Sequence, residues 1–318
     1  MNNPKPYVHE LPDFAELIQF VSGQRRILPQ LVEKDYWIMH SLHGLQQQGF
    51  VFELKGGTSL SKGYRIIDRF SEDIDIRIEP PEDLNVKYGR NQNSPAQVRS
   101  RQEFFDWLAG RIQIAGIQEV VRDTEFDDKD KFRGAGIRLI YPSNFPPAGD
   151  LKSGILLEVG FDDTAPNEAL DISSWAFDTA LAANVQVRDN RAPAVKCYHP
   201  GYTFVEKLQA VSTKFRQQQQ ASVFHVNFLR HYYDLYCLLA HPLVQGYIGT
   251  DLYQERKRQR FRREDNPRIA ENDAFILADP AVRVLYEDEY KKTRGLYYSD
   301  LVPFTSIIER FRVNMDRL

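Results

Sequence analysis

The chain lacks several features that mark particular classes of protein. Cysteine is scarce: Cys197 and Cys237 are the only two among 318 residues, which excludes a disulfide framework and a zinc–cysteine cluster. No apolar run approaches the roughly 18 residues of a membrane span. The first residues, MNNPKPYVHELPDF, lack a basic leader followed by an apolar core. We therefore expect a protein of the reducing cytoplasm that does not bind a membrane.

Charge of one sign is not in excess either. The formal net charge is −3, so affinity for a nucleic acid would have to come from a local basic patch. A P-loop is missing, because no glycine directly precedes Lys62 as the G-x-x-x-x-G-K-[ST] motif requires. An ATPase of that class is therefore not expected. The length and the 42% hydrophobic content are sufficient for two domains, each with its own core.

A strand, a tight turn and the start of a helix are predicted after the short β-prone stretch 51–54. The turn and the first helical positions are Gly56, Gly57, Thr58 and Ser59. Paired glycines let a backbone approach a ligand closely, and the unpaired amides at a helix N-terminus attract phosphate. The hydroxyl groups would add donors. The same residues are equally typical of an ordinary turn. The choice between a phosphate-binding turn and an ordinary turn therefore depends on the strand that follows.

That strand is SEDIDIRI, which follows a helix expected to continue through Ile67. Strict alternation places Asp73 and Asp75 on the face opposite the isoleucines. The two carboxylates then lie roughly 6 to 7 Å apart along the strand. Hard divalent cations such as Mg²⁺ or Mn²⁺ prefer oxygen ligands and serve phosphoryl transfer. A solvated outer face is the alternative, but the position directly after the glycine turn favours a metal site.

A third carboxylate stands alone in the apolar strand ILLEVGF, residues 155–161. Glu158 is the one charged residue of this run, and an unpaired carboxylate in a core costs several kcal/mol. It therefore needs a cation, hydrogen-bond donors or a metal, unless it reaches solvent at a sheet edge. Asp162 and Asp163 beyond the strand are weaker candidates and fit a turn.

These motifs carry a family resemblance. KGGTSLSK and RFSEDIDI, together with VEKDYW at 32–37, EKLQA at 206–210 and RHYYDL at 230–235, occur in an order that resembles the AbiEii/AbiGii toxin family of nucleotidyltransferases. YEDEYKK and FTSIIERF near the C-terminus continue the likeness. The resemblance implies an α+β fold similar to the DNA polymerase β-like minimal nucleotidyltransferase, with a mixed sheet and helices, followed by an all-helical domain.

The resemblance also implies roles for individual residues. Gly56, Gly57, Thr58 and Ser59 would bind the triphosphate, Asp73 and Asp75 the metal, and Glu158 would be the third carboxylate and the base for the acceptor hydroxyl. Lys207 would be a catalytic or triphosphate-binding lysine. The residues alone allow another interpretation, because Lys207 lies beside the buried helix stripe that contains Leu208 and could extend its ammonium to water.

Asp234 is the last residue to which the resemblance gives a role: it would assist catalysis by orienting either Lys207 or a substrate hydroxyl. Arg230 lies four residues earlier, so an ordinary i,i+4 ion pair is the alternative. His231 departs from the pattern, because many relatives carry aspartate there. A proton shuttle is conceivable at this position, and a packed histidine is the simpler interpretation.

A basic run, RKRQRFRR, occupies residues 256–263. It contains Arg256, Lys257, Arg258, Arg260, Arg262 and Arg263, with Phe261 as a ring on which a base could stack. Such a patch would bind a phosphate backbone with marked salt dependence. A solvated face balanced by Glu264 and Asp265 is the alternative.

We predict two domains, residues 1–195 for the nucleotidyltransferase and residues 196–318 for the helical domain that completes the active-site cleft. Within the first, the predicted elements are helices at 12–22, 27–47 and 97–115, strands at 117–128, 134–143 and 155–161, and a possible strand at 185–188. Glu33, Lys34 and Asp35 are interpreted as surface charge pairs. The alternative, which the family resemblance at VEKDYW implies, is that part of this segment supports the active site.

The resulting hypothesis is the toxin of a bacterial toxin–antitoxin or phage-defence pair. It would move a nucleoside monophosphate from an NTP to an RNA acceptor, the 3′ end of tRNA being the one that the resemblance implies, with a separate antitoxin protein as partner. Two other classes remain open from the residues. One is a small-molecule nucleotidyltransferase, which would not use the basic run, and the other is a non-catalytic nucleotide-binding protein.

Overall fold

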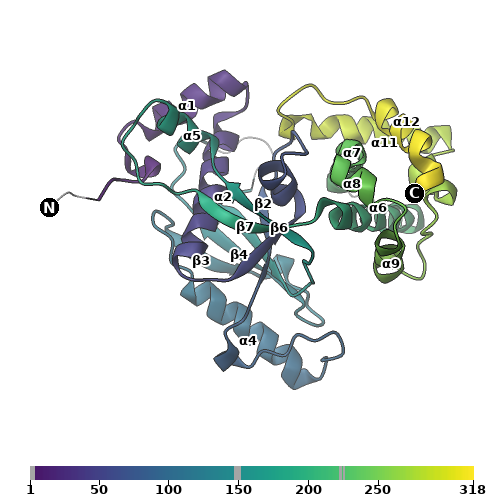
Figure 1. Cartoon of the computed structure of the whole chain (residues 1–318), viewed down its shortest axis with the longest axis horizontal. Helices are drawn as coiled ribbons and strands as arrows, with labels where there is room; N and C mark the ends of the chain where they lie inside the picture. Colours follow the sequence, from purple (N-terminus) through teal and green to yellow (C-terminus); the bar gives the residue numbers. More distant parts are fainter. Residues whose placement is uncertain (1–3, 147–151, 222–223, 225) are drawn as a thin grey trace. The chain divides into compact units, whose positions relative to one another are not determined.

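The structure is a computed structural model that describes residues 4–146, 152–221, 224 and 226–318. The chain divides into two compact units (Figure 1). The first comprises Met1–Tyr64 and Phe70–Tyr198, and the second comprises Arg65–Arg69 and His199–Leu318. Each unit is described by itself. The sequence gives no signal that the five residues from Arg65 belong with the second unit.

The first unit is built on a seven-stranded mixed sheet with the order β3-β4-β5-β2-β1-β7-β6. Its strands are β1 Phe52–Lys55, β2 Asp73–Ile78, β3 Glu119–Asp123, β4 Gly134–Ile140, β5 Ile155–Gly160, β6 Asn167–Ile172 and β7 Ala192–Tyr198. β2 runs parallel to β5 and β1 parallel to β7, while the other neighbours are antiparallel. The expected α+β class with a mixed sheet is confirmed.

Alternation along β2 sets which residues enter the core. Ile74, Ile76 and Ile78 are buried, whereas Asp73 and Asp75 on the opposite face are half-buried. The neighbouring β5 is buried along most of its length, as expected for a strand in the middle of a sheet. The β2–β5 pair is therefore the rigid centre of this unit.

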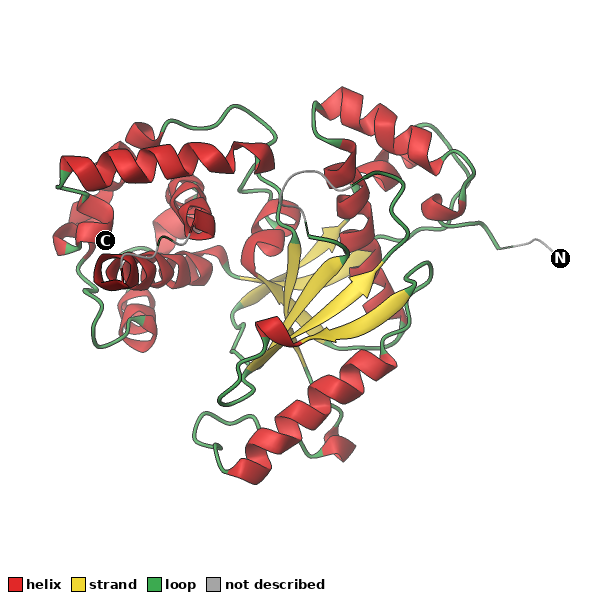
Figure 2. Ribbon diagram, turned by 180° about the vertical axis from the view of Figure 1, so that it is seen from behind, coloured by secondary structure: helices red, strands yellow, loops and turns green. Residues whose placement is uncertain are grey.

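Helices surround the sheet (Figure 2). α2 Pro29–Gln47 and α4 Pro95–Arg111 pack against its strands, and α1 Phe14–Arg25 and α5 Trp175–Ala182 pack against α2. α2 contacts β5 and β7 as well as α1 and α5, and α4 contacts β3. Proline at the start of α2 and of α4 suits the first helical turn, which has no partner for the missing amide. α2 is thus covered on several sides, and this explains the burial of nearly every residue from Leu31 to Leu45.

Two local predictions are wrong. The helix after the glycine turn does not reach Ile67, since it consists of α3 Gly56–Thr58 and a π-helical turn at Ser59–Gly63, and Arg65 then has a left-handed φ of 56°. Residues 185–188 form no strand. Instead Val185 closes the end of α5 through its amide, which donates to the Ala180 carbonyl. β6 was not predicted from the sequence, because most of its residues are exposed and its apolar and polar residues do not alternate.

The second unit is helical. Its α-helices are α6 Pro200–Ala221, α7 Arg230–Ala240, α8 Pro242–Tyr247, α9 Asp251–Arg260, α10 Asp273–Ile276, α11 Pro280–Lys291 and α12 Phe304–Asn314. Aromatic rings form its core: Tyr232 contacts the rings of Tyr286, Phe304 and Phe311. Among the described residues of both units, no helix is long and apolar enough to cross a membrane.

Candidate active site

The glycine turn lies directly against the aspartate strand. Gly56 follows β1 with a φ of +72°, a conformation that favours glycine. A Cβ atom at this position would lie 2.8 Å from Cγ of Asp75 and closer still to its Oδ2. Glycine at position 56 therefore makes room for the Asp75 carboxylate, and the two motifs identified in the sequence form one structural feature.

A hydrogen bond from Thr58 connects the same turn to β2. Its hydroxyl donates to the backbone carbonyl of Asp73 over 2.6 Å, and the residue is 1% exposed. Ser59 is fully buried. The hydroxyl group of Thr58 thus serves the fold of the turn, which leaves the backbone amides around Gly57 as the donors best suited to a phosphate.

Three carboxylates share one face of the sheet. In the register of the parallel β2–β5 pair, Asp75 stands beside Glu158 and Asp73 beside Leu156. Paired residues of adjacent strands point to the same face, and the strands lie about 4.8 Å apart. Lys55 of β1 extends the row, because it is paired with Asp75 on the other side. The sheet therefore brings Asp73, Asp75 and Glu158 together as the sequence predicted.

Burial and mutual repulsion both raise the pKa values of Glu158 and Asp73. Burial, followed by the charges of Asp75 and Asp73, raises the pKa of Glu158 to about 8, which Lys55 and Lys152 partly oppose. Burial, Asp75 and Glu72 likewise raise the pKa of Asp73. Three carboxylates at this separation would be stabilised in their charged forms by a bound cation.

The carboxylates of this cluster fit a divalent metal by their chemistry. Carboxylate oxygens are the ligands that Mg²⁺ and Mn²⁺ prefer, and the charges of Asp75 and Asp73, which after burial raise the pKa of Glu158, are those that a bound cation would offset. Within the described ranges, however, no group of three or more His, Cys, Asp or Glu residues is already closed around a metal position. The chemistry of Asp73, Asp75 and Glu158 thus fits, and their side chains would have to converge on the ion.

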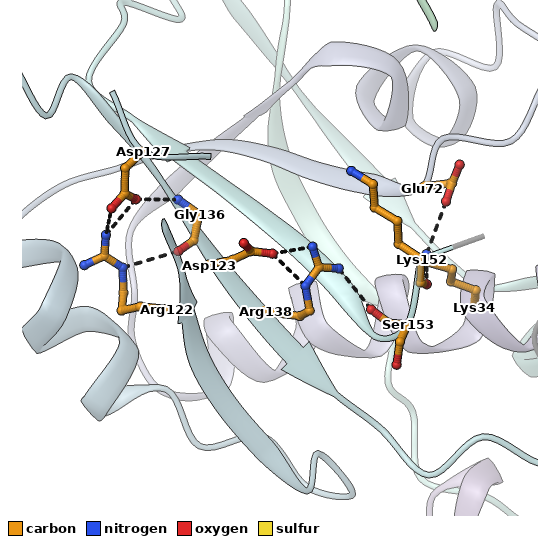
Figure 3. A network of polar contacts seen from close by, with 9 residues as sticks. All are labelled: Lys34, Glu72, Arg122, Asp123, Asp127, Gly136, Arg138, Lys152 and Ser153. Atoms are coloured by element: carbon orange, nitrogen blue, oxygen red, sulfur yellow. Dashed lines mark hydrogen bonds and ion pairs between the residues drawn. The ribbon is translucent and has the colours of Figure 1, made fainter. Parts of the chain in front are cut away.

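Lys34 of α2 is a cation beside this cluster that the sequence did not single out. It is 2% exposed, and its Nζ lies 2.9 Å from the Lys152 carbonyl oxygen and 3.4 Å from Oε2 of Glu72 (Figure 3). Its charge lowers the pKa of Asp73. Lys34 therefore supplies part of the positive charge that the carboxylates require.

The expectation of surface charge pairs at Glu33, Lys34 and Asp35 is wrong, because all three are buried. Glu33 accepts hydrogen bonds from the Ser143 hydroxyl and the Asn144 amide, at 2.7 and 2.9 Å. Asp35 forms an ion pair with Lys62 and accepts from the Trp175 amide at 2.9 Å. The sequence contained a signal for this burial, because apolar residues directly precede and directly follow these three charges in the helix.

Arginine–carboxylate pairs hold the strands next to Glu158. Arg122 contacts both oxygens of Asp127 at 2.7 and 2.8 Å, and Arg138 of β4 bonds to Asp123 of β3 (Figure 3). Gly136, which is in register with Glu158, has no room for a side chain because a Cβ would lie 2.5 Å from the Asp123 carbonyl. These contacts hold β3 against β4, the strand that pairs with β5.

A second group of predicted residues meets within the helical unit. Asp234 is fully buried and accepts hydrogen bonds on both oxygens from Arg69, each at 2.6 Å. Lys207 of α6 lies 2.8 Å from the same carboxylate. Burial alone would raise the pKa of Asp234, but Arg69 and Lys207 hold it well below its usual range. The carboxylate is therefore charged and fixed in place.

One simpler interpretation of this cluster is wrong. Lys207 does not extend to water, because it is 7% exposed and its ammonium lies 2.8 Å from the Asp234 carboxylate. The role of Arg69 was missed, although it stands in the RFSEDID motif. His231 is half-buried with Nδ1 3.3 Å from the Lys207 ammonium. Burial and then Lys207 lower its pKa well below the usual value, so its ring is neutral and can accept from Lys207.

The six positive residues of the basic run do not lie on one exposed face. The prediction that all six form a single exposed patch is therefore wrong. Arg256 and Lys257 are buried: the first pairs with Glu206 at 2.6 Å, and the second donates to the Leu318 carbonyl oxygen. Arg260 is half-buried with its Nε 3.9 Å from Glu206. The exposed members of the run are Arg258, Arg262 and Arg263.

Comparison with known proteins gives one match. A family model described as nucleotidyl transferase AbiEii toxin, type IV toxin–antitoxin system, matches residues 43–311. The match includes the glycine turn, the carboxylates of β2 and β5, and the Lys207–Asp234 pair. No curated protein matches this chain.

Proposed function

The chain belongs to the AbiEii family of nucleotidyl transferase toxins, and on this premise we propose that it transfers a nucleoside monophosphate from an NTP to an RNA. The observation that supports this reaction is the contact of Gly56 with Asp75, which joins a phosphate-binding turn to a row of carboxylates. Nucleotidyl transfer requires both elements in one place, because the triphosphate and the attacking hydroxyl must meet at the α-phosphorus.

The residues of the first unit divide the work of substrate binding and proton transfer. The backbone amides at Gly57, Thr58 and Ser59 bind the triphosphate. Asp73, Asp75 and Glu158 would hold Mg²⁺ or Mn²⁺, which when bound supplies positive charge to the phosphates. An acceptor hydroxyl attacks the α-phosphorus, the bond to the β-phosphate breaks and pyrophosphate leaves. Glu158 takes the proton of that hydroxyl as general base.

Lys207 and Asp234 serve the same reaction. The Lys207 ammonium neutralises charge that develops on the leaving pyrophosphate, and Asp234 is a positioning residue that fixes Lys207 at 2.8 Å. Arg69 in turn fixes Asp234 through two parallel hydrogen bonds. Three residues separate Arg69 from Asp73 in the sequence, so the covalent chain links this cluster to the carboxylate strand.

The acceptor is an RNA, with the 3′ end of tRNA as the specific proposal, and its modification stops growth. A separately encoded antitoxin protein is the partner that prevents this. Support comes from the family, whose members are toxins of type IV toxin–antitoxin systems. Expression of the chain should therefore arrest bacterial growth, and co-expression of its cognate antitoxin should restore it.

A labelling experiment tests the activity. The protein is incubated with Mg²⁺, total RNA and each of the four α-labelled NTPs, and the products are separated by size. We expect label in a tRNA-sized band with at least one NTP, and none with Asp73→Asn. Asp83→Asn is the matched control, because Asp83 is exposed and lies outside the sheet. Label in a small molecule and none in RNA would contradict the proposal.

A further inference from the structure

A hollow of about 350 Å³ lies in the helical unit, where α9 ends and the following loop begins. We call it the basic hollow, and its lining includes Arg258, Phe261, Arg262, Arg263, Pro267 and Arg268. Its volume is at the lower end of the range for ligand pockets, which suits a single nucleotide and not a duplex. The buried Arg256 and Lys257 anchor α9 beneath it through Glu206 and Leu318.

The charge of the basic hollow is almost entirely positive. Asp265 is an acid in its lining, but it is buried and its carboxylate is engaged by Arg216, at 2.9 Å, and by the Thr213 hydroxyl. Within the described part of the chain, the acidic partners of Arg258 and Arg268 are exposed glutamates three positions away. Such exposed pairs are weak, so an incoming phosphate can replace the glutamate.

Arg262 and Arg263 add two exposed guanidinium groups to this set. Neither has an acidic side chain within 4 Å among the residues that the structure describes. Phe261 stands next to them as the residue that ends α9, and it is half-buried and lines the hollow. An aromatic ring among free guanidinium groups is the combination that binds single-stranded nucleic acid: the cations hold the backbone and the ring stacks on a base.

We propose that the basic hollow binds one nucleotide of single-stranded RNA, with its base on Phe261 and its flanking phosphates on Arg258, Arg262, Arg263 and Arg268. This inference rests on the proposed function for the identity of the acceptor as RNA. An acidic peptide would satisfy the arginines but would leave the ring without a stacking partner. A free phosphate would fill a small part of the 350 Å³. The hollow is thus an acceptor-binding subsite in the helical unit.

The test measures binding without catalysis. A 5′-fluorescein-labelled oligo(U) 12-mer is titrated with the full-length protein at 50 to 200 mM KCl in the absence of NTP, and anisotropy reports the Kd. In Arg262→Ala/Arg263→Ala we expect at least 10-fold weaker binding at 100 mM KCl. The slope of log K against log salt is negative, and its magnitude should decrease by about 1.4, because each lost phosphate contact removes about 0.7. In Phe261→Ala we expect about 5- to 100-fold weaker binding with an unchanged slope.

Two controls make the outcome specific. Lys291→Ala/Arg312→Ala removes two exposed positive charges from other helices of the same unit and should bind like the wild type. Asp73→Asn should also bind like the wild type while losing transfer, so that a failure of catalysis is separated from a failure of the hollow. Wild-type affinity in both hollow variants would overturn the inference. So would an equal loss in the control, or displacement of the RNA by an oligo-glutamate peptide at the same concentration as by unlabelled RNA.

Discussion

Asp75 on β2 stands in direct register with Glu158 on β5. The Asp75 carboxylate fits there because residue 56 is a glycine, and a Cβ atom at that position would overlap it. This relationship joins three stretches that are far apart in the sequence. It explains why the glycine of the turn, the aspartate pair and the lone glutamate occur in one chain.

Gly56→Ala should damage both stability and activity. The added Cβ overlaps the Asp75 carboxylate, and alanine at a φ of +72° is strained. We expect a loss of about 1–3 kcal/mol in the free energy of unfolding and no measurable transfer. Gly110→Ala is the matched control: it has open space in α4 and should stabilise the protein by up to about 1 kcal/mol. Urea unfolding of both variants decides, and a Gly56→Ala enzyme with wild-type stability and rate would contradict the site geometry.

Lys34→Met should reduce the transfer rate about 10- to 100-fold, the cost of removing one charge contact near a reacting group. Without the ammonium, the pKa of Asp73 rises further, so less of this carboxylate is charged at neutral pH. Lys34→Arg keeps the charge and should recover part of the rate. Initial rates of NMP incorporation at pH 7 and 8.5 are the readout. Equal rates for wild type and Lys34→Met would show that Lys34 only supports the fold.

The Arg69–Asp234–Lys207 cluster should behave as one unit. Arg69→Ala leaves a buried carboxylate with one partner fewer, which is expected to cost about 3–5 kcal/mol of stability. Asp234→Asn should lower kcat, and this effect should largely vanish when Lys207 is already methionine, because Asp234 acts through Lys207. A double-mutant cycle on kcat measures the coupling. Fully additive effects would contradict the positioning role of Asp234.

His40 gives the protein a defined acid sensitivity. It is buried on α2, with Nε2 2.9 Å from the Ala115 carbonyl and Nδ1 3.0 Å from the Asn190 amide. Burial, and the nearby His9, lower its pKa to about 3. The unfolded chain therefore binds more protons between pH 3 and 6.5. The His40 contribution to stability is complete above pH 6.5 and falls by about 1.4 kcal/mol for each pH unit below it.

His40→Gln should consequently be less stable than the wild type at pH 7, and the difference should shrink as the pH falls to 4.5. Urea midpoints at pH 4.5, 5.5 and 7 provide the measurement. A difference that is constant over this range would mean that His40 titrates equally in the folded and unfolded chain.

Much of this arrangement was accessible from the sequence. The family and the α+β class were recognised from ordered motifs and are confirmed, and alternation in β2 gave the correct faces for Asp73 and Ile74. Long-range register was not accessible. Nothing local shows that Glu158 stands beside Asp75, that Lys34 reaches Glu72, or that Arg69 binds Asp234 across 165 positions. Tertiary partners also reversed the expected exposure of Glu33, Lys34 and Asp35, because each buried charge found a polar group from a distant segment.

The most direct test of the account is the transfer rate of Glu158→Gln, measured together with its stability. Glutamine removes the general base and one of three mutually repelling carboxylates. We predict a kcat lower by about 10²- to 10⁴-fold and, at pH 8 without added metal, a free energy of unfolding that is unchanged or higher than that of the wild type. Glu168→Gln, at an exposed position of β6, should change neither quantity. A Glu158→Gln enzyme that transfers nucleotide at the wild-type rate would contradict the central claim.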